Sequence, residues 1–152
     1  MAKTQNSPTL VKSEKKAPTR ITCTLGEIEV AVPALRKLVQ RELPAKQGYH
    51  ISKLARLIQQ ESDLFEQRVN KLCEELGELK QPTEESRAKG LTVPYHQVPP
   101  EKMDLYHEKL KDLRAVEVTL NWGPIPIEWF ESSTLAAIDI MLLGPFLDGE
   151  LR

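Results

Sequence analysis

The fold is decided by residues 45–79, AKQGYHISKLARLIQQESDLFEQRVNKLCEELGEL, which carry the longest periodic pattern in the chain. Apolar side chains recur there at spacings of three and four, and charged side chains fill the intervals, as in an amphipathic helix. A helix of this length spans about 52 Å, whereas a compact domain of this chain length has a radius of gyration of about 15 Å. We therefore expect an elongated helical bundle. The apolar positions are Leu54, Leu57, Ile58, Leu64, Phe65, Val69, Leu72, Leu76 and Leu79.

The apolar stripe of this long helix needs a cover. Shorter helices packed along it in series would supply one within a single chain. The alternative is a helical seam with a second chain. Glu61 and Arg68 interrupt the stripe near its middle, where they would lie at the edge of the bundle.

Two segments flank the long helix. Residues 21–32 combine β-branched residues with alternation, so we expect a short strand or turn there. Pro33 suits the first turn of a helix, which we place over 33–42. After the long helix, residues 80–100 hold four of the eleven prolines and many polar side chains. They predict a long loop, with part of it packed in an extended form.

Two more helices are predicted in the second half of the chain. Residues 101–114 carry an apolar 3-4-3 stripe and should pack antiparallel to the long helix. Residues 133–143 should form a last, mostly apolar helix that Ser133 caps and Gly144 ends. Together with the segments above they predict a single helical domain over residues 21–152.

The pattern between these two helices changes to that of strands. In VEVTL, residues 116–120, apolar and polar side chains alternate, as in a half-buried strand. A turn at Asn121 to Pro124 leads to a second extended piece, IPIEW, in which Pro126 restricts it to a sheet edge. We expect a small β-hairpin over 115–130, so the fold class is mainly α with a small β-hairpin.

Three aromatic residues, Trp122, Trp129 and Phe130, cluster around this predicted β-hairpin in a chain that has only 5% aromatic residues. They can plug the β-hairpin onto the helices. They can also anchor a partner, because aromatic side chains bury a large area at a small cost in conformational entropy. They are therefore candidate partner-binding residues.

The charge of the chain is unevenly distributed. Residues 1–20 carry five basic side chains against Glu14 alone, while the rest of the chain is acidic. This basic arm has few large aliphatic residues, so by itself it should be flexible and disordered. Its candidate partner-binding residues are Lys12, Lys15, Lys16 and Arg20. The basic arm could bind an acidic protein neighbour. That neighbour could be another copy of this chain, whose remaining residues are acidic overall.

Nucleic acid is a weaker candidate partner. Lysine and arginine side chains bind phosphates without sequence preference and with strong salt dependence. A predicted helical face extends the positive region, but Glu42 dilutes it and the sequence shows no aromatic platform beside it. The basic residues of this face are Arg36, Lys37, Arg41, Lys46, Lys53 and Arg56.

The sequence shows no apparatus for catalysis. Cys23 and Cys73 form no metal-binding pair and have no basic neighbour in sequence that would activate them. The three histidines, His50, His96 and His107, lack metal-ligand spacing, and no phosphate-loop or nucleophile-elbow motif is present. We expect no catalytic residue, no metal and no cofactor. No apolar run is long enough to predict a membrane span, so we expect no membrane partner.

Four stretches resemble small uncharacterised proteins of tailed bacteriophages and prophages. The similarity covers about residues 25–148 and includes an LPAK turn, a PIPI segment and a closing LLGPFL. It implies a phage origin, a place in the virion or the host cytoplasm, and a non-enzymatic role. The stretches are RELPAKQGYHISKLARLIQQE, PPEKMDLYHEKL, VEVTLNWGPIPIE and STLAAIDIMLLGPFLD.

These observations give three functional hypotheses. The first is a non-enzymatic phage protein that acts through protein–protein contacts, as an accessory or assembly component of the particle and within an oligomer or larger assembly. The second is a small intracellular inhibitor or adaptor that binds a host or phage enzyme through the aromatic β-hairpin. The third is a nucleic-acid accessory protein.

Overall fold

The structure is a computed structural model that describes residues 19–130 and 136–149. It confirms the predicted fold class, because helices dominate and the strands form only small two-stranded sheets. The described helices are α1 (Leu25–Val39), α2 (Ala45–Leu76), α3 (Glu84–Ala88), α4 (Met103–Arg114) and α5 (Ala137–Leu143), with short 3-10 segments at Pro100–Lys102, Ile127–Phe130 and Gly144–Phe146.

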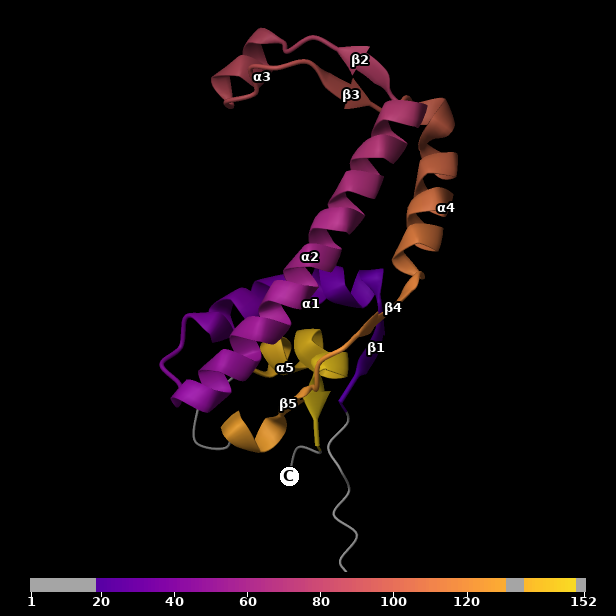
Figure 1. The fold of residues 1–152 in the computed structure, drawn as a ribbon. Helices are drawn as coiled ribbons and strands as arrows, with labels where there is room; N and C mark the ends of the chain where they lie inside the picture. The colour runs from indigo at the N-terminus through magenta and orange to yellow at the C-terminus, as the bar shows by residue number, and fades with distance from the viewer. Residues whose placement is uncertain (1–18, 131–135, 150–152) are drawn as a thin grey trace, which may run out of the picture.

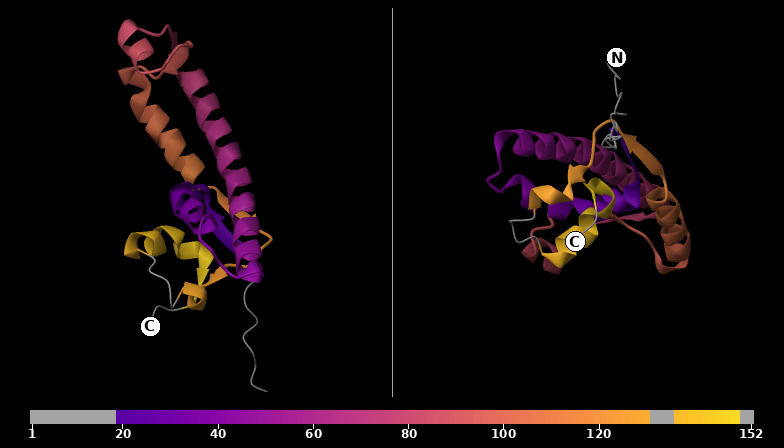
Figure 2. Two further views of the ribbon diagram at one scale, coloured as in Figure 1. Left: turned by 90° about the vertical axis from the view of Figure 1, so that its left-hand side faces the viewer. Right: turned by 90° about the horizontal axis from the view of Figure 1, so that it is seen from below.

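The molecule has a body and a projection. The body contains α1, α5 and the first half of α2 (Figure 1). The second half of α2 leaves the body and α4 returns beside it, which confirms the predicted antiparallel packing (Figure 2). We call α2 and α4 with the segment that joins them the helical hairpin. Its far end bends to one side, and the whole molecule is elongated.

Helix α2 follows the predicted periodicity but ends at Leu76 rather than at residue 79. Gly77 stops it, because this residue is extended and its N–H donates to the Cys73 carbonyl. A side chain at position 77 would collide with that same oxygen, so the stop depends on glycine. At about 1.5 Å per residue, α2 is about 48 Å long. Its buried side chains are Ile51, Leu54, Ile58, Phe65, Leu72 and Leu76.

Helix α1 begins eight residues before the predicted start, and the expectation of a strand or turn through residue 32 was wrong beyond Thr24. The Thr24 side chain accepts a hydrogen bond from the Glu27 N–H at 3.2 Å and caps the helix. Pro33 therefore lies inside α1 and not in its first turn. A continuous buried stripe offsets the hydrogen bond that proline removes: Ile28, Ala31, Ala34, Leu35 and Leu38.

Both strands of the predicted β-hairpin over 115–130 are present, but the prediction that they pair with each other was wrong. Strand β4 (Glu117–Leu120) pairs antiparallel with β1 (Ile21–Thr24), and β5 (Ile125–Pro126) pairs parallel with β6 (Leu147–Asp148). Strand β1 supplies two buried side chains, Ile21 and Cys23, beside β4. The segment after β4 turns toward α2 instead of folding back.

The predicted loop over 80–100 is a connection with structure of its own. Strand β2 (Glu78–Lys80) pairs antiparallel with β3 (Tyr95–Gln97), and α3 lies between them with Thr83 as its cap. This β-ribbon forms the far end of the helical hairpin (Figure 1). The expectation that part of the segment is extended holds for β3.

The core lies in the body, between α1, α2 and the C-terminal segment. Helix α5 docks there through Asp139 and Leu143, while the predicted cap Ser133 lies outside the described residues. In contrast, Leu110 is the one buried residue of α4. The base of the helical hairpin is fastened by Arg114, which donates to both carboxylate oxygens of Glu29 at 2.8 and 3.2 Å. The largest fully buried side chains are Phe146, Ile28, Leu38, Ile51, Leu54, Ile58, Ile125 and Leu143.

Candidate partner-binding surfaces

The three candidate aromatic residues have different positions. Phe130 is a core residue, with 6% of its surface exposed, so its ring is not available to a partner. Trp129 is half-buried and meets the His50 ring edge to face, with the centroids 5.3 Å apart. Trp122 is also half-buried, and its ring lies 5.0 Å from the same histidine. The two tryptophans therefore gather around His50 at the start of α2.

His50 holds residues 122–124 against α2 through hydrogen bonds of its side chain and of its backbone. Its Nε2 lies 2.9 Å from the Gly123 carbonyl oxygen and 3.2 Å from that of Pro124, so this nitrogen carries the proton and donates. In return, Trp122 Nε1 donates to the His50 carbonyl oxygen at 3.0 Å. The histidine is thus occupied in holding the fold together.

A basic surface with aromatic neighbours runs along the outside of α2. Lys46, Tyr49, Lys53 and Arg56 follow a 3-4-3 spacing, which places them on one face, and all four are exposed. The Lys53 ammonium lies 4.4 Å from the centre of the Trp122 ring, a cation–π distance. Tyr49 meets Trp122 edge to face at 6.4 Å. We call these five residues the basic–aromatic face.

The aromatic part of this face corrects the sequence interpretation, in which no aromatic platform accompanied the basic residues. The spacing of Tyr49 from the lysines was a usable signal. Trp122 could not be placed beside Lys53 without the fold. Of the other basic residues in the predicted face, Arg36 and Lys37 belong to α1, where Lys37 Nζ pairs with Asp139 at 3.3 Å.

The basic arm joins the body close to this face. Arg20 is exposed and immediately precedes β1. Because Ile21 pairs with Leu120, Arg20 enters the body next to the Asn121–Trp122 segment. The other candidate residues of the arm, Lys12, Lys15 and Lys16, lie outside the described residues.

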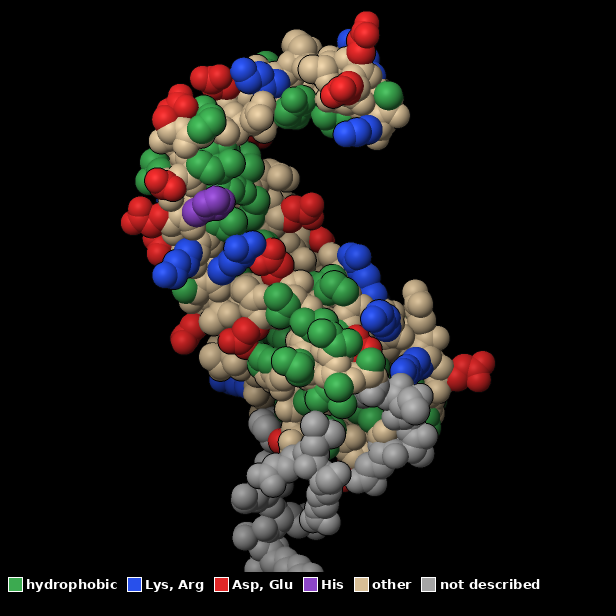
Figure 3. Space-filling view, turned by 180° about the vertical axis from the view of Figure 1, so that it is seen from behind, with side chains coloured by type: hydrophobic (Ala, Val, Ile, Leu, Met, Phe, Trp, Pro, Cys, Tyr) green, Lys and Arg blue, Asp and Glu red, His purple; other side chains and the backbone are tan. Residues whose placement is uncertain are grey.

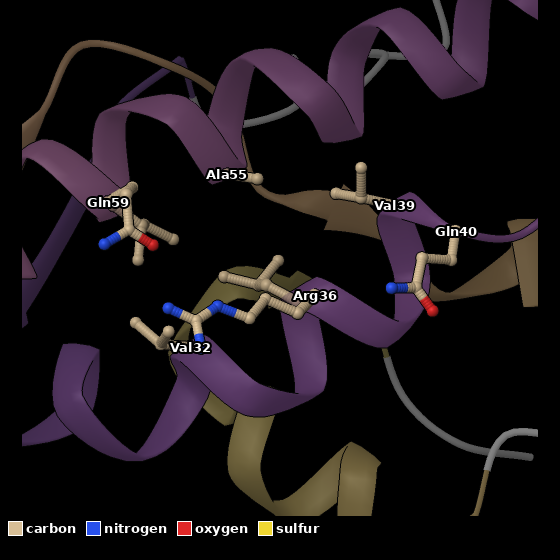
Figure 4. Close-up of a pocket in the computed structure, with 8 residues that line it drawn as sticks. Val32, Arg36, Val39, Gln40, Ala55 and Gln59 are labelled. Atoms are coloured by element: carbon tan, nitrogen blue, oxygen red, sulfur yellow. The ribbon is translucent and has the colours of Figure 1, made fainter. Parts of the chain in front are cut away.

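Two hollows lie along the first half of α2. One has a volume of about 240 Å³ and is lined by side chains of the basic–aromatic face and their neighbours: Tyr49, Ser52, Lys53, Arg56 and Leu57. The other, of about 320 Å³, lies between α1 and α2. Figure 4 shows Arg36 lying along this second hollow, with its guanidinium directed toward the end where Val32 and Gln59 lie. Its lining is mostly apolar and holds no pair of groups suited to proton transfer.

The helical hairpin presents apolar side chains to solvent. Leu79 on β2 is 60% exposed and Val93, before β3, is 62% exposed. Figure 3 shows hydrophobic side chains gathered along the helical hairpin and, separately, over the body. The exposed large apolar residues of the helical hairpin are Tyr49, Leu64, Leu79, Leu91, Val93, Met103 and Leu105.

Burial raises the pKa of two ionisable side chains among the described residues, Cys23 and Tyr106. Burial raises the pKa of the Cys23 thiol to about 11, and nearby Glu27 adds to this, so the reactive thiolate is disfavoured. Burial also raises the pKa of Tyr106, whose hydroxyl accepts a hydrogen bond from Cys73 between α2 and α4. Among residues 19–130 and 136–149, no group of histidine, cysteine and acidic side chains is arranged to hold a metal ion.

None of the described helices has both the length and the apolar character that a membrane span requires.

Comparison with known proteins adds no relative. No family model, no curated protein and no solved structure matches this chain. The resemblance to phage proteins therefore remains an expectation from the sequence. What the protein does must be inferred from its own surfaces.

Proposed function

We propose that this protein works without catalysis, by binding neighbouring protein chains through the end of its helical hairpin. The observation that carries the proposal is the exposed apolar surface at the far end of a projection that the body does not cover. We further propose that it is an accessory or assembly component of a bacteriophage particle, located in the virion or the host cytoplasm, which is the setting that the sequence resemblance implies.

The helical hairpin has little buried surface of its own. Domains are stable because two packed layers of secondary structure share a core. Here α2 and α4 share a single seam, in which Phe65, Leu72, Leu76 and Leu110 are buried. A projection of this kind adds little stability to the body, so its length and its apolar end suit a role in contacts with another chain.

The β-ribbon at the end of the helical hairpin suits a protein partner in particular. Among the described residues, strands β2 and β3 pair only with each other, and a two-stranded ribbon has two open edges. Open edges can accept a strand from a partner, and apolar pockets or side chains beside them give specificity. Leu79 and Val93 are such side chains. A partner strand here would be a protein, either another copy of this chain or a different subunit.

The inhibitor or adaptor hypothesis has less support. It relied on an aromatic β-hairpin as the binding surface, whereas Phe130 lies in the core and both tryptophans contact His50. Their contacts fasten residues 121–130 to α2 and leave less aromatic surface for a target enzyme.

The proposal is tested by shortening the helical hairpin. Glu78 and Gln97 are paired across the β-ribbon, and paired Cα atoms in antiparallel strands are only about 5 Å apart. An Asn-Gly turn can therefore replace residues 79–96 without moving α2 or α4. The shortened chain should unfold at nearly the same temperature as the full chain, because the body is unchanged.

The functional measurement is mass spectrometry of particles purified from the phage or prophage that encodes the chain, with light scattering of both proteins. We expect the full chain at a fixed copy number per particle and the shortened chain absent. A control with Met141→Asp, on the exposed side of α5 in the body, should still be incorporated. Equal incorporation of the shortened chain would refute binding through this end, and absence of the full chain would refute the particle role.

A further inference from the structure

We infer that the basic–aromatic face of α2 binds single-stranded nucleic acid. This inference does not depend on the far end of the helical hairpin or on the proposed role in a particle. It rests on the charge, the exposure and the contacts of Lys46, Tyr49, Lys53, Arg56 and Trp122.

The charge of α2 is divided along its length. Residues 45–60 carry Lys46, Lys53 and Arg56 and no acidic side chain, and the first acidic residue of the helix is Glu61. Lys46 lies in the first turn, where the helix dipole disfavours cations. Helix stability therefore does not explain this distribution, whereas a negatively charged ligand does.

The three cations are available to such a ligand. All three side chains are exposed, and within the described part of the chain no carboxylate forms an ion pair with any of them. Trp122 restrains Lys53 at 4.4 Å from its ring centre, which lowers the conformational entropy that this lysine would lose on binding. Arg20, the exposed residue immediately before β1, adds a further cation next to the Asn121–Trp122 segment.

Tyr49 distinguishes single-stranded nucleic acid from other polyanions. Its side chain is 64% exposed and lies between the cations of the face. Bases of a single strand stack on such rings while the phosphates contact lysine and arginine. The adjoining hollow, about 240 Å³ in volume, is smaller than the roughly 300–1,000 Å³ of small-molecule sites. It suits one unit of a polymer better than a whole small ligand.

An acidic protein segment is the competing partner for this face. It would use the cations but has no reason to need the Tyr49 ring. A duplex would also use the cations, but its bases are stacked internally and cannot reach the ring. Tyr49 is thus the residue whose substitution separates the three partners.

The test is fluorescence anisotropy of the full chain with a labelled oligothymidylate of about 20 nucleotides, long enough to cover a typical single-strand site. If Lys46, Lys53 and Arg56 contact phosphates, the affinity should fall about 20-fold between about 50 and 200 mM salt. Tyr49→Ala should weaken binding at least about fivefold, whereas Tyr49→Phe keeps the ring and should bind normally. Both substitutions are on an exposed side chain, and thermal unfolding checks that the variants remain folded.

Charge variants complete the test. Lys53→Gln with Arg56→Gln should reduce the slope of log affinity against log salt by about 1.4. The matched control, Arg87→Gln with Lys89→Gln, removes the same charge at the end of the helical hairpin and should change nothing. The inference fails if the full chain does not bind at the lower salt, or if Tyr49→Ala binds normally. It also fails if polyglutamate or duplex DNA competes as well as the single strand does.

Discussion

Replacement of Pro33 by alanine should stabilise the protein. Pro33 lies in the interior of α1 and its side chain is exposed, so no packing is lost when the ring is removed. Alanine restores the N–H that can donate to the Glu29 carbonyl one turn earlier. Proline costs about 3 kcal/mol in a helix interior, and the more flexible unfolded chain of the variant returns about 0.4–1 kcal/mol. The native helix has already adjusted to Pro33, so only part of the difference between these two free energies is regained on substitution. We expect a net gain in the free energy of unfolding of about 1–2 kcal/mol.

The assay is urea unfolding followed by circular dichroism, together with calorimetry. For a chain of this size, the expected gain raises the melting temperature by about 3–6 °C. Pro44→Ala is the matched control, because Pro44 precedes α2 as its N-cap and removes no helical hydrogen bond. The control should not gain stability. If Pro33→Ala is neutral or destabilising, residues 25–39 do not form one continuous helix, and the boundary at residue 33 predicted from the sequence is the correct one.

Three further predictions concern the body. Lys37→Met should lower the free energy of unfolding by about 1–2 kcal/mol in urea titration, because the buried Asp139 carboxylate loses its charged hydrogen-bond donor; an unchanged value would show that this ion pair does not matter. Leu54→Ala should cost about 2–5 kcal/mol, whereas Leu64→Ala, on the exposed side of the same helix, should cost under about 0.5 kcal/mol; equal losses would contradict the register of α2. Burial raises the pKa of Cys23 from 9.0 to about 11, so the thiol ionises first in the unfolded chain and stability falls as the pH rises from about 9 to 11. The stability of the native chain should fall more steeply than that of Cys23→Ala, by up to about 1.4 kcal/mol per pH unit in unfolding titrations across this range, and parallel curves would refute the shift.

The helices show how far local sequence signals reach. Helix α2 could be predicted because its stripe repeats over many turns and a single misplaced residue does not hide it. Its end could have been placed at Gly77, since glycine commonly stops helices. The start of α1 also had a local signal, Thr24 with Glu27 three residues later, the spacing of a capping box. The prediction gave more importance to Pro33 and started the helix there. In the structure, the burial of the apolar stripe of α1 stabilises a helix that continues through Pro33.

The strand pairings had no local signal. Strand β4 pairs with β1, which lies almost a hundred positions earlier in the chain. The turn residues between β4 and β5 are equally compatible with a β-hairpin. What decides between the two arrangements is tertiary: Ile21 and Cys23 fill the core beside β4, and Trp122 docks on α2. Neither contact can be read from the residues around the turn.

The candidate site was also predictable only in the part that depends on local sequence. The basic residues of α2 and the exposed Tyr49 could be placed on one face from spacing alone. The contact of Lys53 with Trp122 depends on the β1–β4 pairing and on the hydrogen bonds of His50. Phe130 could not be separated from the two tryptophans in sequence, because burial, and not residue type, excludes it from the surface.

The most direct test of the central claim is photo-crosslinking in the native host cell. A photoreactive phenylalanine analogue replaces Val93 at the end of the helical hairpin in one strain and Val39, which is exposed on α1, in another. If the protein binds its neighbours through this end, irradiation should give an adduct of one defined mass from position 93 and none from position 39. No adduct at position 93, or the same adducts at both positions, would contradict the claim.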